Sequence, residues 1–184
     1  MMRRWLLPLL FGLAVAVFAW QAALVAAPRI IMSIAVERLA EAGGINRMLH
    51  APLAGPGRRT IVRPSPDLAY SSCPFDLSRT ALFLRVMPNQ APYWSLSVFD
   101  RNTDVAFVRN NRDSKGGVID LVLAREGQAV PPGFETVRLK GDRGIALLRI
   151  LVPDRARFAE LDRARRSSFC SGEALLTSPV SEAE

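Results

Sequence analysis

Apolar positions are densest at the start of the chain. From Trp5 to Ala27 the sequence carries no charged residue over 23 positions. A helix rises about 1.5 Å per residue, so this run spans roughly 34 Å, enough to cross the hydrocarbon core of a bilayer. Pro8 falls in the first turn of such a helix, where its missing N–H is not needed. The pattern predicts a transmembrane helix over 5–27, preceded by a short cytoplasmic segment, residues 1–4.

A second helix is predicted directly after this run. Ile31, Ile34 and Leu39 recur at helical spacing, and the glycine pair that follows is typical of a helix end. Pro28 favours a break between the two helices, so the second is expected to be a separate amphipathic helix. Several prolines come next, and a helix does not accommodate them. Residues 28–59 are therefore predicted to be a helix plus a proline-rich linker.

From residue 60 onward the pattern changes to alternation. In the clearest segment, Tyr93–Phe99, Trp94, Leu96 and Val98 point to one face and the residues between them to the other. Six further runs are rich in β-branched and aromatic residues: TIVR, ALFLRVM, VAFVR, VIDLVLA, FETVRLK and IALLRIL. Turn-forming residues separate the runs, and no long helix intervenes. We therefore predict a mainly β domain over 60–172, an antiparallel β-sandwich or jelly-roll-like fold.

A short helix is predicted to close this domain. Residues 154–168 begin after a proline, and Phe158 and Leu161 give them a narrow apolar stripe. Residues 173–184 are expected to form a loose tail.

The amino-terminal helix has a competing interpretation, a cleaved signal peptide. A positive start and several alanines fit a signal peptide as well. The apolar run is long for one, however, and Pro28 directly follows the best small-residue cleavage site, residues 25–27. We therefore expect an uncleaved, single-pass anchor. Arg3 and Arg4 favour an internal amino terminus, which in a Gram-negative bacterium places the domain in the periplasm, anchored to the inner (cytoplasmic) membrane.

The chain is strongly basic, with 24 lysine and arginine residues against 17 acidic ones and a formal net charge of +7. A basic domain tethered beside a bilayer is drawn to anionic headgroups, so the anionic membrane surface is an expected partner. An arginine-rich composition with a solvated basic face explains the same charge without a partner. Nucleic acid is not expected, because the basic residues are scattered and no nucleic-acid-binding motif is present.

Cys73 and Cys170 are the candidate disulfide. In an oxidising compartment, two cysteines far apart in sequence commonly form one bridge. This bridge would close a loop of 97 residues and pin the carboxy-terminal helix to the segment that leads into the sandwich. Two reduced thiols, with Cys73 buried, are the alternative.

Few residues suit catalysis or metal binding. His50 is the single histidine and lies in the proline-rich linker, so neither a metal site nor a cofactor is expected. A serine hydrolase would need Ser71 or Ser72 to recruit His50 as its base, and no Gly-x-Ser-x-Gly motif is present. These observations favour a domain without enzymatic activity.

The segment Asp100–Asp104 matches the start of a calcium loop, with oxygen ligands at positions one, three and five. The match ends there, because Val105 replaces the required glycine and Asn111 the required glutamate. A tight strand connection is the favoured interpretation, with Asn102 or Asp104 capping the turn.

The passage RPSPDLAYSSCPFDLS, residues 63–78, is a second candidate site. Its prolines hold the chain extended, Asp67 can bond nearby backbone amides, and the hydroxyl of Tyr70 needs a partner when buried. We interpret the passage as a structural clasp. A ligand-contacting cleft formed with Asp100 and Asp104 stays open, as does a carboxylate pair for glycoside hydrolysis.

Three passages together resemble the bacterial family called domain of unknown function 1254: RPSPDLAYSSCPFDLS, APYWSLSVFDRNTDVAFVRN and RGIALLRILVPD. The similarity covers about residues 28–166, and the chain looks like the short, membrane-anchored form. The resemblance implies a β-rich domain, often found with a companion, domain of unknown function 1214, either fused downstream or carried by a neighbouring protein. It implies no catalytic residues.

The expected function is therefore that of an interaction module. A single-pass protein would present a basic β-sandwich in the periplasm and assemble with a protein that carries the companion domain. The alternative is a cell-envelope enzyme or ligand-binding protein that acts on carbohydrate or lipid.

Overall fold

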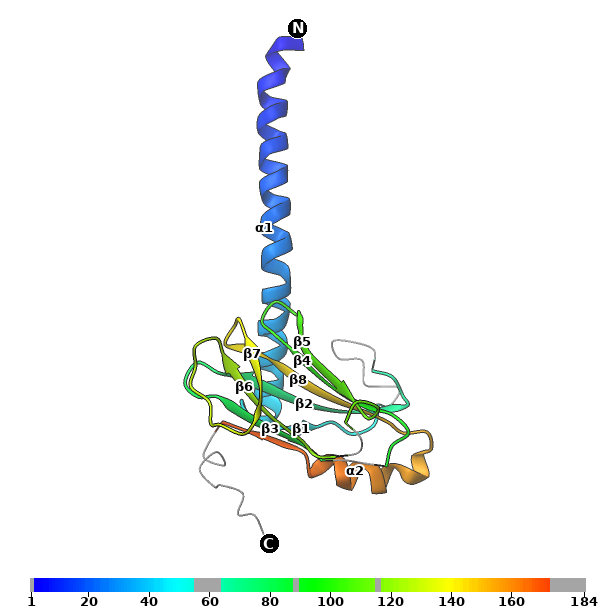
Figure 1. Cartoon of the computed structure of the whole chain (residues 1–184). Helices are drawn as coiled ribbons and strands as arrows, with labels where there is room; N and C mark the ends of the chain where they lie inside the picture. Colours follow the sequence, from blue (N-terminus) through cyan, green and yellow to red (C-terminus); the bar gives the residue numbers. More distant parts are fainter. Residues whose placement is uncertain (1, 55–63, 88–89, 115–116, 173–184) are drawn as a thin grey trace.

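The chain folds into one long helix and a two-sheet β domain. The structure, a computed structural model, describes residues 2–54, 64–87, 90–114 and 117–172. Helix α1 (Met2–Gly43) stands out from the domain (Figure 1). The predicted closing helix is present as a three-ten turn, η1 (Arg155–Arg157), followed by α2 (Phe158–Arg166). The predicted strand at 60–63 and the predicted tail at 173–184 lie outside the described residues.

Two sheets form the domain. The strands of the described residues are β1 (Leu49–His50), β2 (Leu68–Asp76), β3 (Leu82–Val86), β4 (Trp94–Phe99), β5 (Val105–Asn110), β6 (Ile119–Arg125), β7 (Glu135–Leu139), β8 (Arg143–Leu151) and β9 (Phe169–Ser171). Sheet A has the order β1-β2-β8-β4-β5, and sheet B the order β7-β6-β3-β9. One apolar core joins them, with Phe75 and Trp94 from sheet A and Leu84 and Leu121 from sheet B. The predicted β-sandwich is confirmed.

One strand pair departs from the predicted antiparallel pattern, because β7 runs parallel to β6. Turn-forming residues separate these two runs in the sequence, but the chain makes a long loop between β6 and β7 rather than a tight turn. Gly127 takes a positive φ of 77° in this loop. Arg138 donates through Nη1 to the carbonyls of Arg125 and Gln128, which fixes the loop beside β7. Sheet B is therefore mixed.

The passage that leads into the sheet is itself a strand, β2, paired with β8 along its whole length. Pro74 lies inside it, although proline lacks a ladder donor. The proline is tolerated because β1 pairs with β2 only at Ser71 and Ser72, so this edge of β2 is unpaired at Pro74. The Pro74 carbonyl instead accepts a hydrogen bond from the backbone N–H of Asn46 (2.8 Å).

Helix α1 is continuous through Pro28, so the predicted break there is wrong. A proline inside a helix removes one hydrogen bond and costs about 3 kcal/mol. The helix persists because its second half packs on sheet A, where Met32 and Val36 are 7% and 3% exposed. It ends as predicted at the glycine pair, since Gly44 takes a φ of 92° and donates to the Ala40 carbonyl.

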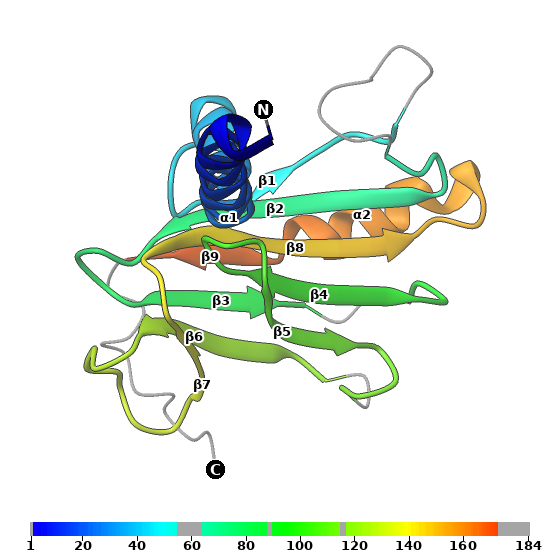
Figure 2. The same ribbon diagram turned by 90° about the horizontal axis from the view of Figure 1, so that it is seen from above.

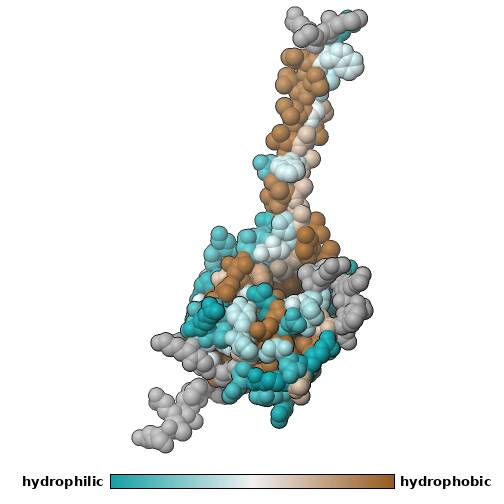
Figure 3. Space-filling view, turned by 90° about the vertical axis from the view of Figure 1, so that its right-hand side faces the viewer, coloured by the Kyte–Doolittle hydropathy of each residue, from teal (hydrophilic) through white to brown (hydrophobic). Residues whose placement is uncertain are grey.

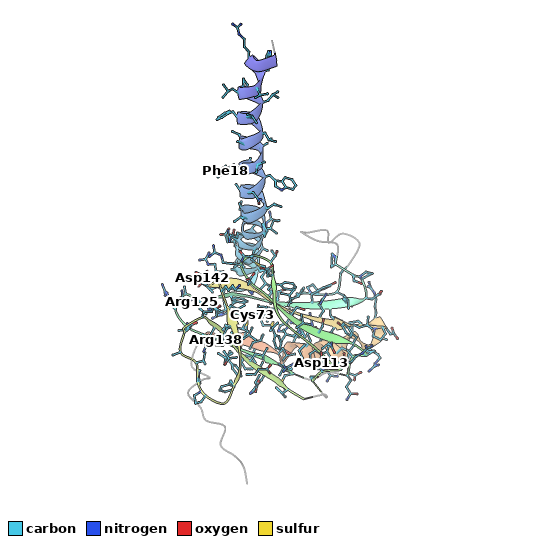
Figure 4. The ribbon with its side chains drawn as sticks, turned by 45° about the horizontal axis from the view of Figure 1, so that its top comes forward. Phe18, Cys73, Asp113, Arg125, Arg138 and Asp142 are labelled. Atoms are coloured by element: carbon cyan, nitrogen blue, oxygen red, sulfur yellow. A yellow bond between two sulfur atoms is a disulfide. The ribbon has the colours of Figure 1, made fainter. Side chains whose placement is uncertain are left out.

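The first half of α1 is exposed and packs on no other described part of the chain. Trp5, Phe11 and Phe18 are 69%, 73% and 77% exposed. Figure 3 shows this apolar surface along the helix, where it gives way to polar side chains on the domain, and Figure 4 shows Phe18 projecting from it. Among the described residues, α1 is the one helix that is long and apolar enough to cross a membrane. Membrane anchors and signal sequences share this property.

Polar contacts fix the second half of α1 against sheet A. Arg29 Nε donates to Asn102 Oδ1 in the β4–β5 turn (2.9 Å). At the far end, the Asn46 side chain donates to the Asp76 carbonyl (3.1 Å) and accepts from the Asp76 N–H (2.8 Å). The β5 edge of sheet A therefore lies nearest the apolar half of α1 (Figure 1).

Candidate functional site

The two predicted pairs, Asp67 with Tyr70 and Asp100 with Asp104, lie at opposite ends of sheet A. Asp67 lies beside the end of β8, and Asp100 lies beside its start. At about 3.3 Å per residue of β8, roughly 20 Å separate the two pairs. The two pairs are therefore too far apart to line one cleft, and the carboxylates of Asp67 and Asp100 are too far apart to act as a pair.

Tyr70 holds the chain in place where it approaches β2. Its hydroxyl oxygen accepts a hydrogen bond from the backbone N–H of Ser65 (3.0 Å). The Asp67 carboxylate is exposed and has no hydrogen bond within the described part of the chain. The clasp thus depends on Tyr70 rather than on Asp67.

The β4–β5 turn is capped by Asp100. Its buried carboxylate accepts through Oδ1 from the backbone N–H groups of Asn102 (2.7 Å) and Asp104 (3.1 Å), and Thr103 takes a φ of 67°. The predicted tight connection is present, but Asp100 rather than Asn102 or Asp104 caps it. Across the described ranges, no three or more His, Cys, Asp or Glu side chains gather where they could hold a metal ion.

A buried polar network joins α2 to the first two strands. His50 and Ser71 face each other across β1 and β2, with Nδ1 2.9 Å from Oγ. Arg165 of α2 donates to the same Oγ (3.4 Å) and to the Tyr70 carbonyl, and it pairs with Asp162. Ser71 and Arg165 are both 0% exposed. Burial lowers the pKa of Arg165, and the hydrogen bond to Asp162 opposes that shift.

This network does not have the arrangement of a serine hydrolase. Ser71 has no exposed surface through which a substrate could reach its hydroxyl. The neighbouring carboxylate, Asp162, bonds to Arg165 and Arg166 and does not orient His50. The network therefore stabilises the fold. Arg165 was marked in the sequence only by its spacing, four residues after Leu161 on the apolar stripe of the closing helix.

We expect His50 to make stability depend on pH. Burial, followed by the charges of Arg165 and Arg166, lowers the pKa of His50 to about 4. The unfolded chain takes up this proton near pH 6.5 and the folded chain only near pH 4, so stability is full above pH 6.5 and falls as the pH drops through this window. Urea midpoints should therefore fall over this range in the wild type and fall less in His50→Gln. Equal slopes in both proteins would contradict the assignment.

Cys73 and Cys170 are joined by a disulfide in the structure, with Cα atoms 6.5 Å apart. The bridge connects β2 of sheet A to β9 of sheet B, just beyond α2. Both residues are buried, and Figure 4 shows Cys73 inside the domain. The bond therefore crosses the core of the sandwich.

Four polar side chains form a row across the outer face of sheet A. Tyr70 pairs with Arg149, Arg149 with Ser95, and Ser95 with Asn110. The four strands that carry them, β2, β8, β4 and β5, lie side by side in Figure 2. The residues before and after Arg149 are buried in the core. Because successive side chains of a strand point to opposite faces, the row lies on the outer face of sheet A, on which α1 packs. We call these four residues the Arg149 row.

Arg149 has no carboxylate partner among the ion pairs of the described residues. It is half-buried, and its Nη2 makes a single long hydrogen bond, 3.4 Å, to Ser97 Oγ. Its Nε and the Oγ of Ser95 are buried without a hydrogen bond. Native proteins leave few buried polar atoms unpaired. Arg149 Nε and Ser95 Oγ are therefore two buried polar atoms that the fold leaves without a partner in the described part of the chain.

The alternation of Tyr93–Phe99 predicts Ser95 on the face opposite Trp94, whereas no pattern in the sequence marks Arg149 as a site residue. Arg149 is the one charged residue within the run IALLRIL. Its row-mates come from three other strands, however, and only the sheet order brings them together.

A hollow of about 780 Å³ lies where α1 leads into the sandwich. Arg47, Arg79 and Arg143 line it, together with Asp76, which pairs with Arg143. These arginines are exposed, and the hollow is broad and polar. It offers room for an anionic ligand.

The family model described as "Protein of unknown function (DUF1254)" matches residues 45–170. No curated protein matches the chain. Among solved structures, the VPA0106 protein from Vibrio parahaemolyticus matches with a TM-score of 0.66 at 14% sequence identity, over 89% of this chain. At that identity the likeness shows the fold alone. This chain spans 41% of the length of the Vibrio protein.

An uncharacterized protein from Burkholderia cenocepacia also matches, with a TM-score of 0.42 at 12% identity, over 58% of this chain and 31% of that one. A likeness this low adds nothing to the fold assignment.

Proposed function

Because this chain belongs to the DUF1254 family, we propose that it is a single-pass membrane protein whose β-sandwich acts as an interaction module in the periplasm. Its partner is a protein that carries domain of unknown function 1214. The observation that carries the proposal is helix α1, which joins an exposed apolar half to a half packed on sheet A without a break.

The continuity of α1 supports an anchor that is retained. The small residues at 25–27, the best cleavage site in the sequence, lie inside the helix, so cutting there would require the helix to unwind. The bond from Arg29 to Asn102 also holds the domain close beneath the apolar half. A retained anchor therefore fixes the sandwich in one orientation to the bilayer.

Two features support a location outside the cytoplasm. Disulfides persist in oxidising compartments, and the bridge between Cys73 and Cys170 is of that structural kind. Arg3 and Arg4 precede the apolar run, which favours retention of the amino terminus on the cytoplasmic side.

The edge of sheet A supports an interaction role. β5 ends the sheet, and Val105 and Val108 on it are 56% and 54% exposed. An unpaired edge with apolar side chains is a surface that another chain can cover. The similar Vibrio protein has further polypeptide beyond the part that matches, since this chain spans 41% of it. A fold of this kind beside additional chain is consistent with a companion domain.

The alternative function, a ligand-binding protein of the cell envelope, is favoured by the hollow of about 780 Å³. Arg47 and Arg79 have no ion-pair partner among the described residues, so the hollow is suited to an anionic ligand.

Site-specific photo-crosslinking in native membranes tests the proposed function. A photo-reactive side chain at Val108 should give one discrete adduct with a protein that carries the companion domain. The matched control is Arg163, which is exposed on α2 and should give none. Equal adducts from both positions, or recovery of the chain alone after mild detergent extraction, would overturn the proposal.

A further inference from the structure

We propose that two turns of the sandwich form a second contact with the bilayer, a surface that binds phospholipid headgroups through their phosphates. The turns are the β4–β5 turn, residues 100–104, and the β7–β8 turn, residues 140–142, and we call them together the headgroup surface. The inference rests on the proposed function, because it requires α1 to be a retained anchor. It adds to that function the side of the domain that contacts lipid.

The length of α1 places the β4–β5 turn at the depth of the headgroups. The uncharged run ends at Ala27, and Arg29 lies about 3 Å further along the helix. The headgroup layer on each side of the hydrocarbon core is roughly 5–8 Å thick, so Arg29 lies within it. Arg29 Nε donates to Asn102 Oδ1 (2.9 Å), which holds the β4–β5 turn at the same depth.

The part of α1 that packs on sheet A keeps an apolar face turned away from the sheet. Met32 and Val36 are buried against the sheet. Ile30, Ile31 and Ile34 are 56%, 58% and 41% exposed. At 3.6 residues per turn, these isoleucines lie on the opposite side of the helix from the buried pair. Apolar surface therefore continues to where the helix meets the domain (Figure 3), and its burial in lipid is favourable.

Each of the two turns carries an exposed cation. Arg101 and Lys140 form no ion pair within the described part of the chain. The two turns also touch, because a Cβ added at Gly141 would lie 2.5 Å from Cδ of Arg101. The side chain of Arg101 therefore runs over the residue that follows Lys140, and both cations lie beside Asn102.

The carboxylates of the two turns are less accessible than these cations. Asp100 is buried and accepts from backbone N–H groups of its own turn. Asp142 is half-buried, and Asp104 alone among the three is exposed. The exposed charges of the headgroup surface are thus mainly positive. A guanidinium and an ammonium both donate to phosphate oxygens, which every phospholipid headgroup presents.

The test uses the full chain, with Cys73 and Cys170 in their bridge, reconstituted into phospholipid vesicles. A fluorophore is attached at Thr103→Cys in the β4–β5 turn or, as the matched control, at Arg163→Cys on α2. Both positions are exposed, and α2 lies on the side of the domain away from the apolar half of α1 (Figure 1). The vesicles contain a phosphatidylcholine that carries a nitroxide on its headgroup, which quenches the fluorophore only at short range.

The contribution of the two cations is measured in the Thr103→Cys chain. Arg101→Gln/Lys140→Gln removes both charges from exposed turn positions, so the core of the domain is unchanged. Arg155→Gln/Arg163→Gln removes two exposed charges from η1 and α2 and is the control.

We expect the nitroxide to quench the probe at Thr103 severalfold more than the probe at Arg163. Arg101→Gln/Lys140→Gln should remove much of this difference, and the control pair should leave it unchanged. If both probes are quenched equally, or if removing the two cations has no effect, the headgroup surface is refuted while the anchor stands. Release of the chain from washed vesicles would instead refute the anchor, and the headgroup surface with it.

Discussion

Replacing Arg165 with methionine is expected to lower the free energy of unfolding of the domain by about 3–5 kcal/mol, the usual cost of breaking a buried ion pair from one side. Arg165 is 0% exposed and donates to Asp162, to the Tyr70 carbonyl and to Ser71 Oγ. Methionine fills a similar volume, so the loss reports the missing hydrogen bonds rather than a cavity. Urea unfolding can be followed by the fluorescence of Trp94, which lies in the core.

Arg166→Met is the matched control for this measurement. Arg166 pairs with the same Asp162, but its side chain is 54% exposed. Exposed ion pairs contribute about 1 kcal/mol or less, so this variant should unfold close to the wild type. Equal losses from the two variants would show that the buried network does not join α2 to the sandwich.

Loss of the bridge between Cys73 and Cys170 is expected to lower the free energy of unfolding by about 4–5 kcal/mol in the chain-entropy account. The bond closes a loop of 97 residues and links the two sheets. The Cys73→Ala/Cys170→Ala double variant should therefore unfold at a much lower urea concentration than the oxidised wild type.

The reduced wild type is the control for that variant, because it has the same sequence as the oxidised protein. It should unfold with the double variant and migrate differently from the oxidised chain on a gel. Identical mobility with and without reductant, with both thiols alkylated after denaturation, would contradict the bridge.

The β-sandwich could be predicted because strand alternation is a local signal. Tyr93–Phe99 alternates as read from the sequence, and Trp94, Leu96 and Val98 do point into the core. The strand β2 could not be recognised in the same way, because Pro74 argues against a paired strand. Its tolerance depends on how short β1 is, which is a property of the sheet order rather than of the local sequence.

The helix break at Pro28 illustrates the same limit. Local propensity favours a break, but Met32 and Val36 pack on sheet A and hold the second half in line with the first. The parallel pairing of β7 likewise depends on a loop path that turn residues alone do not determine.

The candidate site was less accessible from the sequence than the fold was. Tyr70 and Ser95 were visible as polar residues on or near strands, but Arg149 gains its meaning from neighbours on three other strands. Asp67 and Asp104 attracted attention as carboxylates, yet both are exposed in the structure. Charged residues are easily noticed in a sequence, whereas the burial of a polar group without a hydrogen-bond partner becomes visible only in the folded structure.

The intact mass of the chain extracted from washed membranes tests the central claim most directly. If α1 is a retained anchor and the sandwich folds in an oxidising compartment, the chain stays with the membrane, keeps residues 5–27, and weighs two hydrogens less than its reduced form. A soluble chain that begins near Pro28, or a membrane-bound chain with two free thiols, would contradict the account.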